Sequence, residues 1–308
     1  MNILVTGASG FLGTHLVRRL TALGHRVIAA HSRNADLRLA GSLDALDPGP
    51  LDEIWHLAAW TQAGDFCLHH PAEQWIINQQ IHTHVLAWWR ERQPRARMIG
   101  IGTSCSYAPG SDLREDLYLE GKPIEGLFTY AMTKRMLLAG MEACHRQDGL
   151  QYLHLVPSTL YGPGYHTDGR QLHFIFDLIR KILAAKHYGT PVVLWGDGHQ
   201  KRELVFIDDF LTAALDLRAA AANTTVNIGA GEEHSIRDFA QTICELLDFP
   251  FEQIAFDTSR YVGARSKVLN VDRLRELLPA FRTTPLRAGL RTTIEWMRTH
   301  PETFIRPD

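Results

Sequence analysis

The chain has 308 residues, and its 32 lysines and arginines nearly balance its 34 aspartates and glutamates, giving a formal net charge of −2. This length allows one or two domains with a sizeable core. The balanced charge, without a basic block, gives no electrostatic footprint for nucleic acid or a membrane surface as partners. No apolar run approaches transmembrane length, and the chain starts with a strand pattern where a signal peptide would stand.

Cysteine and histidine content gives no sign of a disulfide framework or a metal centre. The cysteines form no C-x-x-C pair: Cys67, Cys105, Cys144 and Cys244. The 16 histidines contain no H-E-x-x-H motif, and His82 and His84 stand two apart on an expected helix, where they do not face each other. We therefore expect a cytoplasmic protein without a metal, in which these two histidines are structural or at the surface.

Strands and helices alternate through the first half of the chain. Strands are expected at residues 2–6, 26–30, 53–58, 97–103 and 151–156, helices near 11–23, 72–92 and 127–147, and a loop at 40–52. This alternation predicts an α/β fold with a Rossmann-like, doubly wound parallel sheet and right-handed crossovers.

The pattern changes after residue 156, where prolines and glycines mark a long loop. The expected elements beyond it are a helix at 172–186, a strand at Val192–Trp195, a strand at Leu204–Ile207 that returns to the main sheet, and from 233 short helices with one strand. We predict a first domain of residues 1–162 plus about 204–232, and a smaller C-terminal α/β domain of about 163–203 and 233–308.

A glycine turn joins the first strand to the first helix. Gly7 permits the tight turn, Gly10 lets the backbone approach a pyrophosphate, and Gly13 lets the helix pack closely on the strand. The helix N-terminus favours the anion. The spacing is G-x-x-G-x-x-G, and its strand–turn–helix context favours a dinucleotide site over a purely structural turn.

Two short segments point to redox chemistry on an alcohol or ketone. Tyr130 and Lys134 lie four residues apart on one helix face, where the ammonium would lower the pKa of the phenol and make it a general acid/base. The alternative is an ordinary helix-surface pair. Thr103 and Cys105 follow an apolar strand, and on an extended segment their side chains would point the same way.

The end of the second strand bears on the choice of cofactor. Arg33 stands there without an acidic residue that would take a ribose 2′-hydroxyl. Since an arginine suits a 2′-phosphate, NADP is preferred over NAD. The alternative is that Arg33 is a solvated loop residue.

Together these motifs resemble the extended short-chain dehydrogenases/reductases of the sugar-nucleotide epimerase/dehydratase group, nearly end to end. The shared motifs are Thr6-Gly7-x-x-Gly10-x-x-Gly13, Leu57-Ala58-Ala59, Asn78, Thr103, Tyr130-x-x-x-Lys134 and Leu160-Tyr161-Gly162-Pro163. Within the group the chain is most similar to the GDP-L-fucose synthase family, which epimerises and then reduces a GDP-4-keto-6-deoxy sugar with NADPH. That similarity lies in residues 102–107 and 156–163, His173, Trp195-Gly196-Asp197-Gly198, Arg202-Glu203, Asp208-Asp209 and Lys267.

The resemblance implies which residues bind the cofactor, with the first domain as the NADP-binding domain. These residues are Gly7, Ser9, Gly10, Phe11, Leu12, Gly13, Arg33, Asp36, Leu37, Leu57, Ala58, Ala59, Asn78, Tyr130, Lys134 and Pro157. Asp36-Leu37 resembles the pair that contacts the adenine, and Lys134 would hold the ribose. Helices 72–92 and 127–147 form a dimer interface in this group, and Trp75, Ile76, Trp88 and Trp89 favour a homodimer here.

The resemblance also implies catalytic roles. Cys105 and His173 match the positions that remove and return protons beside the ketone. Tyr130 would protonate the 4-oxygen, and Thr103 would form a hydrogen bond to that oxygen. Read alone, Cys105 would be a small buried hydrophobe and His173 a surface residue. An epimerase that never reduces, a 4-reductase that never epimerises and, less favoured, a non-enzymatic dinucleotide sensor remain as alternatives.

The second domain would bind the sugar nucleotide, with GDP as its nucleotide. Its expected contacts are Thr159, Lys181, Trp195, Arg202 and Lys267. Thr103 stands where fucose synthases carry serine, Thr159 where they carry asparagine, and the segment 164–171 also differs. These departures leave the exact sugar open.

Overall fold

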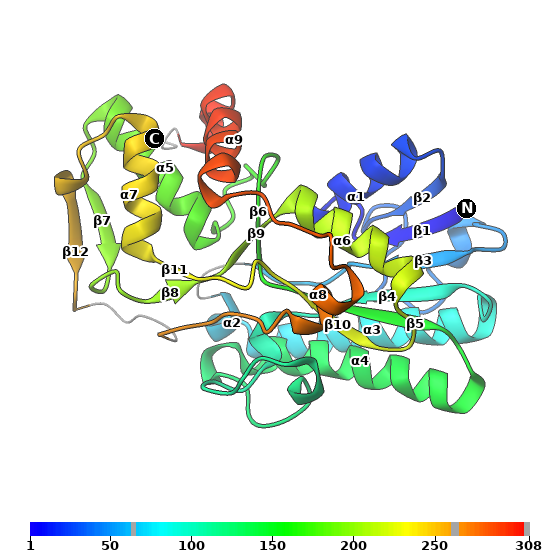
Figure 1. Ribbon diagram of the computed structural model, residues 1–308. Helices are drawn as coiled ribbons and strands as arrows, with labels where there is room; N and C mark the ends of the chain where they lie inside the picture. Colours follow the sequence, from blue (N-terminus) through cyan, green and yellow to red (C-terminus); the bar gives the residue numbers. More distant parts are fainter. Residues whose placement is uncertain (63–65, 260–264, 305–308) are drawn as a thin grey trace.

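The computed structural model describes residues 1–62, 66–259 and 265–304. A six-stranded sheet forms its larger lobe, with strand order β10-β5-β4-β3-β1-β2 and every neighbouring pair parallel (Figure 1). The strands are β1 (Asn2–Thr6), β2 (Arg26–Ala30), β3 (Glu53–His56), β4 (Arg97–Ile101), β5 (Tyr152–Pro157) and β10 (Thr225–Ile228). The predicted α/β fold and its first five strands are confirmed.

Helices cover both faces of this sheet. They are α1 (Phe11–Ala22) and α6 (Ile207–Ala220) on one face, and α3 (Pro71–Arg92) and α4 (Phe128–Asp148) on the other (Figure 1). Because neither face meets water, the strands are continuous apolar runs, as in Ile3, Leu4 and Val5, which are fully buried. The predicted helices 11–23, 72–92 and 127–147 agree with these bounds to within one residue at each end.

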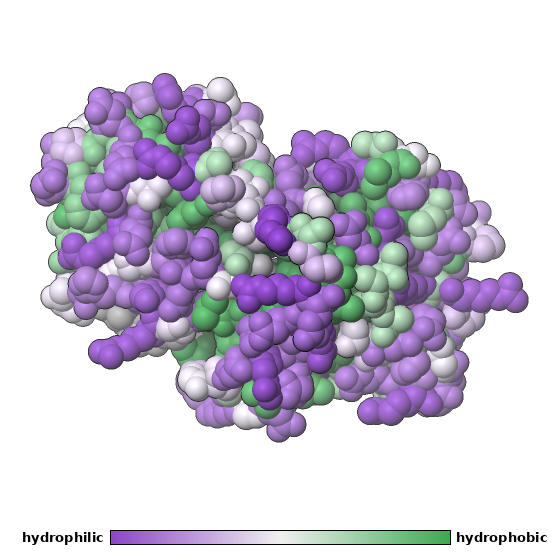
Figure 2. All heavy atoms as spheres, viewed as in Figure 1, coloured by the Kyte–Doolittle hydropathy of each residue, from purple (hydrophilic) through white to green (hydrophobic). Residues whose placement is uncertain are grey.

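A smaller lobe has a separate hydrophobic core. It consists of α5 (Phe174–Tyr188), α7 (Ile236–Leu247) and α9 (Leu286–Thr299), with β7 (Val192–Trp195) and β12 (Ile254–Asp257) as a parallel pair. The remaining short elements are α2 (Phe66–His69), β6 (Thr159–Tyr161), β8 (Lys201–Arg202), β9 (Leu204–Phe206), β11 (His234–Ser235) and α8 (Asp272–Leu277). Figure 2 shows hydrophilic outer surfaces on both lobes, with hydrophobic residues gathered near their junction.

The prediction that Leu204–Ile207 returns to the main sheet is wrong. This segment forms β9, which pairs with β6 in a separate two-stranded sheet, and the last strand of the main sheet is β10. Val205 belongs to the larger core, whereas Leu204 and Phe206 belong to the smaller one. The segment is apolar on both faces because it lies between two cores, which a sequence pattern cannot distinguish from a central strand.

Two further features qualify the expected organisation. Residues 269–281 return to the larger core, where Leu269, Val271 and Leu274 are buried, although the predicted second domain includes them. On α3, the structure buries Trp88 and Trp89 inside the monomer and leaves only Trp75 and Ile76 of the four predicted interface residues exposed. Within the described ranges, no helix combines the length and the apolar character needed to cross a bilayer.

Candidate active site

A cavity of about 1570 Å³ lies between the two lobes, at the carboxyl ends of β1, β3, β4 and β5. In doubly wound folds this edge is the ordinary place for a ligand. Sixteen of the predicted site residues line it: Ser9, Gly10, Phe11, Leu12, Leu57, Ala59, Thr103, Cys105, Tyr130, Lys134, Pro157, Thr159, His173, Lys181, Trp195 and Lys267. The others lie outside its lining: Gly7, Gly13, Arg33, Asp36, Leu37, Ala58, Asn78 and Arg202.

The glycine turn has the geometry that its sequence predicts. Gly7 adopts a φ of +66°, and a Cβ there would lie 2.8 Å from the Ala58 nitrogen. A Cβ on Gly13 would overlap the Gly7 carbonyl oxygen, so both positions exclude larger residues. Gly10 caps α1 without a side-chain hydrogen bond from any described residue, which leaves the first amides of the helix available to an anion in the cavity.

Buried polar groups hold the segment that follows β3, which begins at Leu57 and Ala58. The Thr6 hydroxyl oxygen accepts hydrogen bonds from the Leu57 and Ala58 amides, both at 3.2 Å. It also lies 2.8 Å from His56 Nδ1, and His56 Nε2 lies 2.8 Å from His82 Nδ1 on α3. His56 and His82 are buried, which lowers the pKa of each, that of His56 to about 3. His82 is therefore structural, as predicted.

Asn78 anchors the same segment from α3. Its side chain accepts a hydrogen bond from the Trp60 amide at 2.8 Å and donates to the Trp60 carbonyl at 3.0 Å. The residue is fully buried beneath the cavity wall. Its contribution to a cofactor site would thus come through the position of this loop.

The groups predicted for the adenosine end lie beyond the cavity, after β2. Arg33 is exposed, and Asp36 forms an ion pair with Arg38 in which Nη2 and Oδ2 are 2.6 Å apart. Leu37 is buried, and its carbonyl lies 3.0 Å from His84 Nδ1. An anionic group that extended from the cavity to the end of β2 would therefore contact the solvent-exposed side chain of Arg33.

The segment carrying Thr103 and Cys105 is not extended, contrary to the prediction. Residues 104–106 form a 3₁₀ turn, because the Thr103 hydroxyl accepts a hydrogen bond from the Cys105 amide at 3.3 Å and caps the turn. Both side chains nevertheless reach the cavity.

Tyr130 and Lys134 line the cavity from α4, but their electrostatics differ from the prediction. Burial raises the pKa of Tyr130, and the neighbouring groups of Cys105, Tyr118 and Cys67 raise it further, with a weaker opposing effect from the Thr103 hydroxyl. Burial also lowers the pKa of Lys134 to about 8, and its ammonium donates to the Ile101 carbonyl at 2.9 Å. In this structure Tyr130 is thus a protonated phenol rather than a phenolate.

Arg135, the next residue of α4, was not predicted to matter. Its guanidinium is almost fully buried and donates only to carbonyl oxygens, at 2.5 to 3.1 Å. The acceptors are Ser106, Leu119, Glu120 and Gly121. All five N–H donors of the side chain are used, so Arg135 ties the turn after Cys105 to the helix that carries Tyr130 and Lys134.

Cys105 contacts a lysine from the far end of the chain. Lys267 Nζ lies 2.9 Å from its sulfur. Burial alone would raise the pKa of the thiol, but Lys267, the Thr103 hydroxyl and Arg202 outweigh it and lower the pKa below its ordinary value. Arg202, although outside the cavity lining, is thereby close enough to influence the thiol.

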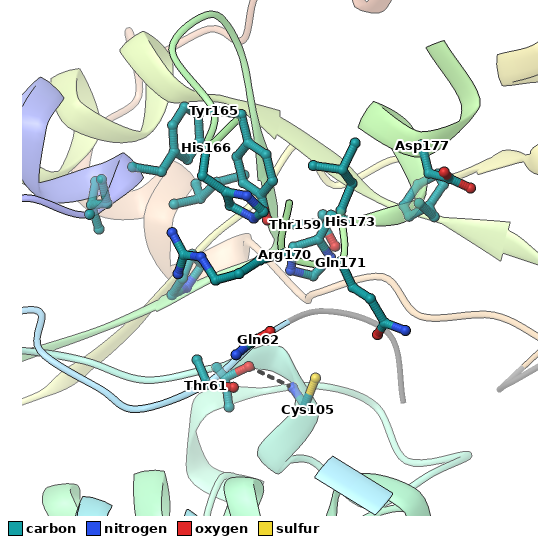
Figure 3. Close-up of a pocket in the computed structure, with 18 of the residues that line it drawn as sticks. Thr61, Gln62, Cys105, Thr159, Tyr165, His166, Arg170, Gln171, His173 and Asp177 are labelled. Carbon is teal, nitrogen blue, oxygen red and sulfur yellow. Dashed lines mark hydrogen bonds between the residues drawn. The ribbon is translucent and has the colours of Figure 1, made fainter. Parts of the chain in front are cut away.

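His173 faces Cys105 across the cavity, and the Cys105 sulfur points toward the space beneath its ring (Figure 3). It stands at the N-cap of α5 and is accessible from the cavity. Desolvation by the surrounding walls, followed by the charges of Lys267 and His166, lowers its pKa to about 4. A thiol and an imidazole are therefore brought to opposite walls of one cavity.

The wall formed by the smaller lobe carries charges in ion pairs. Lys181 Nζ lies 2.9 Å from Asp177, and Arg180 Nη2 lies 2.5 Å from the same carboxylate. Arg170 pairs with Asp168 at 2.8 Å. Trp195 is 58% exposed at the cavity edge.

Several lining residues were missed from the sequence. The segment 164–171 was noted as unusual but given no role, and it contributes Tyr165, His166, Arg170 and Gln171 to the wall (Figure 3). Thr61, Gln62 and Cys67 line the opposite side. Neither group has a motif spacing that would identify it, and the polarity of 164–171 was the one available signal.

Comparison with known proteins places this site in a family. Residues 3–229 match the model described as the NAD dependent epimerase/dehydratase family. The dTDP-4-dehydro-6-deoxy-D-allose reductase of Streptomyces bikiniensis is 28% identical over 324 residues, covering 97% of this chain and 96% of that protein. The GDP-L-fucose synthase of Escherichia coli K12 is 27% identical over 323 residues and 98% of both chains.

A solved structure is similar to the whole fold. The crystal structure of a GDP-L-fucose synthetase from Naegleria fowleri bound to NADP matches with a TM-score of 0.84 at 23% identity, covering 98% of this chain and 95% of that chain. Since the family model also spans well over half of the sequence, the chain belongs to the NAD-dependent epimerase/dehydratase family, and it is similar to nucleotide-sugar epimerases and reductases.

Proposed function

We propose that this protein is an NADPH-dependent epimerase/reductase of a nucleotide 4-keto-6-deoxy sugar, with GDP as the nucleotide. The observation that carries the proposal is the meeting of two sets of groups in one cavity: Thr103, Tyr130 and Lys134 on one side, and the facing pair Cys105 and His173. Ketone reduction needs the first set, and inversion beside the ketone needs the second.

The larger lobe would bind the cofactor. The uncapped N-terminus of α1, with Gly10 at the cavity, fits a pyrophosphate, and exposed Arg33 fits a 2′-phosphate and hence NADP. The structure of the Naegleria fowleri relative bound to NADP supports this choice. The lobe's other proposed cofactor contacts are those predicted from the sequence, with Asn78 acting through the loop it anchors.

A bound nicotinamide dinucleotide supplies the hydride for the ketone carbon. Tyr130, which its raised pKa keeps protonated, would donate that proton to the ketone oxygen as negative charge develops there during hydride transfer. The Thr103 hydroxyl would bond to the same oxygen, and Lys134 would hold the ribose.

Inversion would use the two walls in turn. A carbon next to a ketone has an acidic C–H bond, so Cys105 as thiolate would remove that proton from one face and His173 would return one from the other. The Lys267 ammonium favours the thiolate. A substrate diphosphate would offset the Lys267 charge that lowers the pKa of His173, and so favour its proton-carrying form.

The sugar nucleotide would bind through Thr159 on β6, which pairs with β9 where the two cores meet, and through Lys181, Trp195, Arg202 and Lys267. The GDP-L-fucose synthase of Escherichia coli and the dTDP-sugar reductase of Streptomyces bikiniensis support a nucleotide-sugar substrate. We also propose a homodimer through α3 and α4, supported by exposed Trp75 and Ile76 on α3 and exposed Met136 on α4.

A 4-ketoreductase without epimerisation is the second candidate. It is favoured by the similarity to the Streptomyces bikiniensis protein, which is named as a reductase. A plain 4-ketoreductase would use Thr103, Tyr130 and Lys134 as the first candidate does, but would not need Cys105 or His173.

Incubation with NADPH and GDP-4-keto-6-deoxymannose in deuterated water distinguishes the two candidates. The epimerase/reductase consumes NADPH and gains deuterium at C3, C5 or both, whereas the plain reductase consumes NADPH without deuterium. Cys105→Ser is expected to abolish deuterium incorporation and to spare ketone reduction, and Tyr130→Phe to slow reduction by about 10²–10⁴-fold. Cys144→Ser is the matched control, since that half-buried thiol lies outside the cavity lining.

If the protein neither consumes NADPH nor incorporates deuterium with this sugar and its dTDP counterpart, the proposed reaction is overturned. Deuterium incorporation by Cys105→Ser at the native rate would overturn the role of the thiol.

A further inference from the structure

We infer that Glu203 and Glu233 are positioning residues, which clamp the backbone of segment 265–270 so that the Lys267 ammonium stays on the Cys105 sulfur. The inference rests on the proposed function in making Cys105 the base. It adds two carboxylates that lie outside the cavity lining and that received no role from the sequence, although Glu203 stands in one of the shared motifs.

Glu203 holds the segment on the C-terminal side of Lys267. Its side chain is 2% exposed, and one carboxylate oxygen accepts from the Leu269 amide at 2.9 Å while the other accepts from the Gly231 amide at 2.7 Å. Burial raises the pKa of Glu203 to about 7, although these amides and Lys267 oppose the shift. A carboxylate kept in so unfavourable a place is costly, and the backbone bonds that it makes are its compensation.

Glu233 holds the segment at Lys267 itself. Its Oε2 accepts from the Ser266 hydroxyl at 2.6 Å and from the Lys267 amide at 3.3 Å. Its Oε1 lies 3.8 Å from Lys201 Nζ, and the Lys201 amide donates to the Arg265 carbonyl at 2.8 Å. The backbone is thus fixed immediately before and at Lys267.

The segment is also paired to the larger lobe. Leu269 forms a parallel bridge with Leu113, and the Asn270 amide donates to the Leu113 carbonyl at 3.2 Å. With its backbone held on both sides, the lysine has fewer conformations to lose when its ammonium reaches the sulfur. The clamp therefore makes favourable a contact that a lysine on a loose loop would populate poorly.

Several groups from different elements face the thiol. Lys267 and Arg202 supply positive charge, His173 faces the sulfur across the cavity, and the side chains of Cys67, Tyr118 and Tyr130 on the larger-lobe side interact with the thiol electrostatically. The latter three are neutral when protonated. Loss of the Lys267 contact would consequently leave burial as the main influence and raise the pKa of Cys105.

The pH dependence of alkylation by iodoacetamide tests the clamp without substrate or cofactor. The rate is measured on the full chain between about pH 6 and about pH 10, with mass mapping of the Cys105 peptide, since only thiolate reacts. Lys267→Met is expected to slow alkylation about tenfold near pH 7, by raising the pKa of the thiol about one unit. Glu233→Ala is expected to slow it about threefold.

The sign of the Glu233→Ala effect decides between position and charge. Removing the negative charge of Glu233 would by itself lower the pKa of the thiol or leave it unchanged, so slower alkylation together with a raised pKa in the pH profile indicates a displaced Lys267. Glu232→Ala is the matched control, because this neighbour is exposed and pairs with His234, 3.4 Å away. It is expected to alkylate as the native protein does.

Glu203→Gln is a second, independent variant. Its side-chain NH2 must face the N–H of either Gly231 or Leu269, so one of the two hydrogen bonds is lost and the clamp is weakened. Native or faster alkylation in folded Glu233→Ala would overturn the inference, as would native alkylation in Lys267→Met. These outcomes are separate from the proposed reaction: slowed alkylation in a protein inactive on every keto sugar would retain the clamp and reject the reaction.

Discussion

The two walls of the cavity are built in opposite ways. At and beneath the larger-lobe wall, the polar groups of Thr6, Asn78, Lys134 and Arg135 are buried and hydrogen-bonded to neighbouring backbone groups. On the smaller-lobe wall, the charges of residues 168–181 sit in partly exposed ion pairs. The first wall is preformed, whereas the second can exchange its carboxylate partners for those of a ligand at small cost.

The energetics follow from burial. Leaving a buried polar group without its partner costs about 1–3 kcal/mol, whereas an exposed ion pair contributes about 0–1 kcal/mol. Substitutions on the two walls should therefore separate into different ranges of unfolding free energy.

Arg135→Met should have the largest effect on stability. It removes all five bonds to the carbonyls of residues 106 and 119–121, and we expect a loss of about 3 kcal/mol in the free energy of unfolding. Urea titration at neutral pH measures it. Arg146→Met on the same helix is the control, since that side chain is 72% exposed and should change little. Equal losses in both would contradict the link between the burial of an arginine and its contribution to stability.

Lys134→Met should act in the opposite direction to its neighbour. Burial lowers the pKa of Lys134 from 10.5 to about 8, so the unfolded chain holds this proton more tightly, and the native lysine costs stability below about pH 8. After allowing for the lost bond to Ile101, we expect a gain of about 2 kcal/mol near pH 7. The gain should vanish as the pH rises through 8 toward 10.5, as urea titrations at several pH values would show.

A Lys134→Met protein that is less stable at every pH would mean that its bond to Ile101 outweighs its desolvation. The proposed ketone reduction should be lost in this variant in either case, and Lys134 would then be a residue that supports the proposed activity at the expense of stability.

Arg170→Gln should have the smallest effect on stability. Its pair with Asp168 is partly exposed, so the free energy of unfolding should change by less than about 0.5 kcal/mol. A thermal or urea melt checks this. A loss comparable to that of Arg135→Met would show that the smaller-lobe wall is as preformed as the other.

The same contrast explains what the sequence could predict. Gly7, Gly13, Tyr130 and Lys134 lie in contiguous motifs whose spacing follows from backbone geometry, and the fold around them was predicted to within a few residues. The pKa directions could not be predicted in the same way, because the burial of Tyr130 depends on residues distant in the chain.

The failures have physical reasons of the same kind. Strand β9 reads as a central strand because both of its faces are buried, although they face two different cores. Cys105 leaves the extended conformation because Thr103 caps it. The Lys267–Cys105 contact joins residues 162 positions apart, and no local pattern encodes it.

The buried chain from Thr6 to His82 also fixes where protons sit. Because the Thr6 oxygen accepts two amides, its hydrogen must be donated to His56 Nδ1, and His56 is then the Nε2–H tautomer that donates to His82. A second proton on either imidazole would have to go to its Nδ1, which already accepts a hydrogen bond, and so would break this chain of hydrogen bonds. Protonating these rings in acid should therefore oppose folding, and the loop beside the cavity should keep its native position until the fold itself is lost.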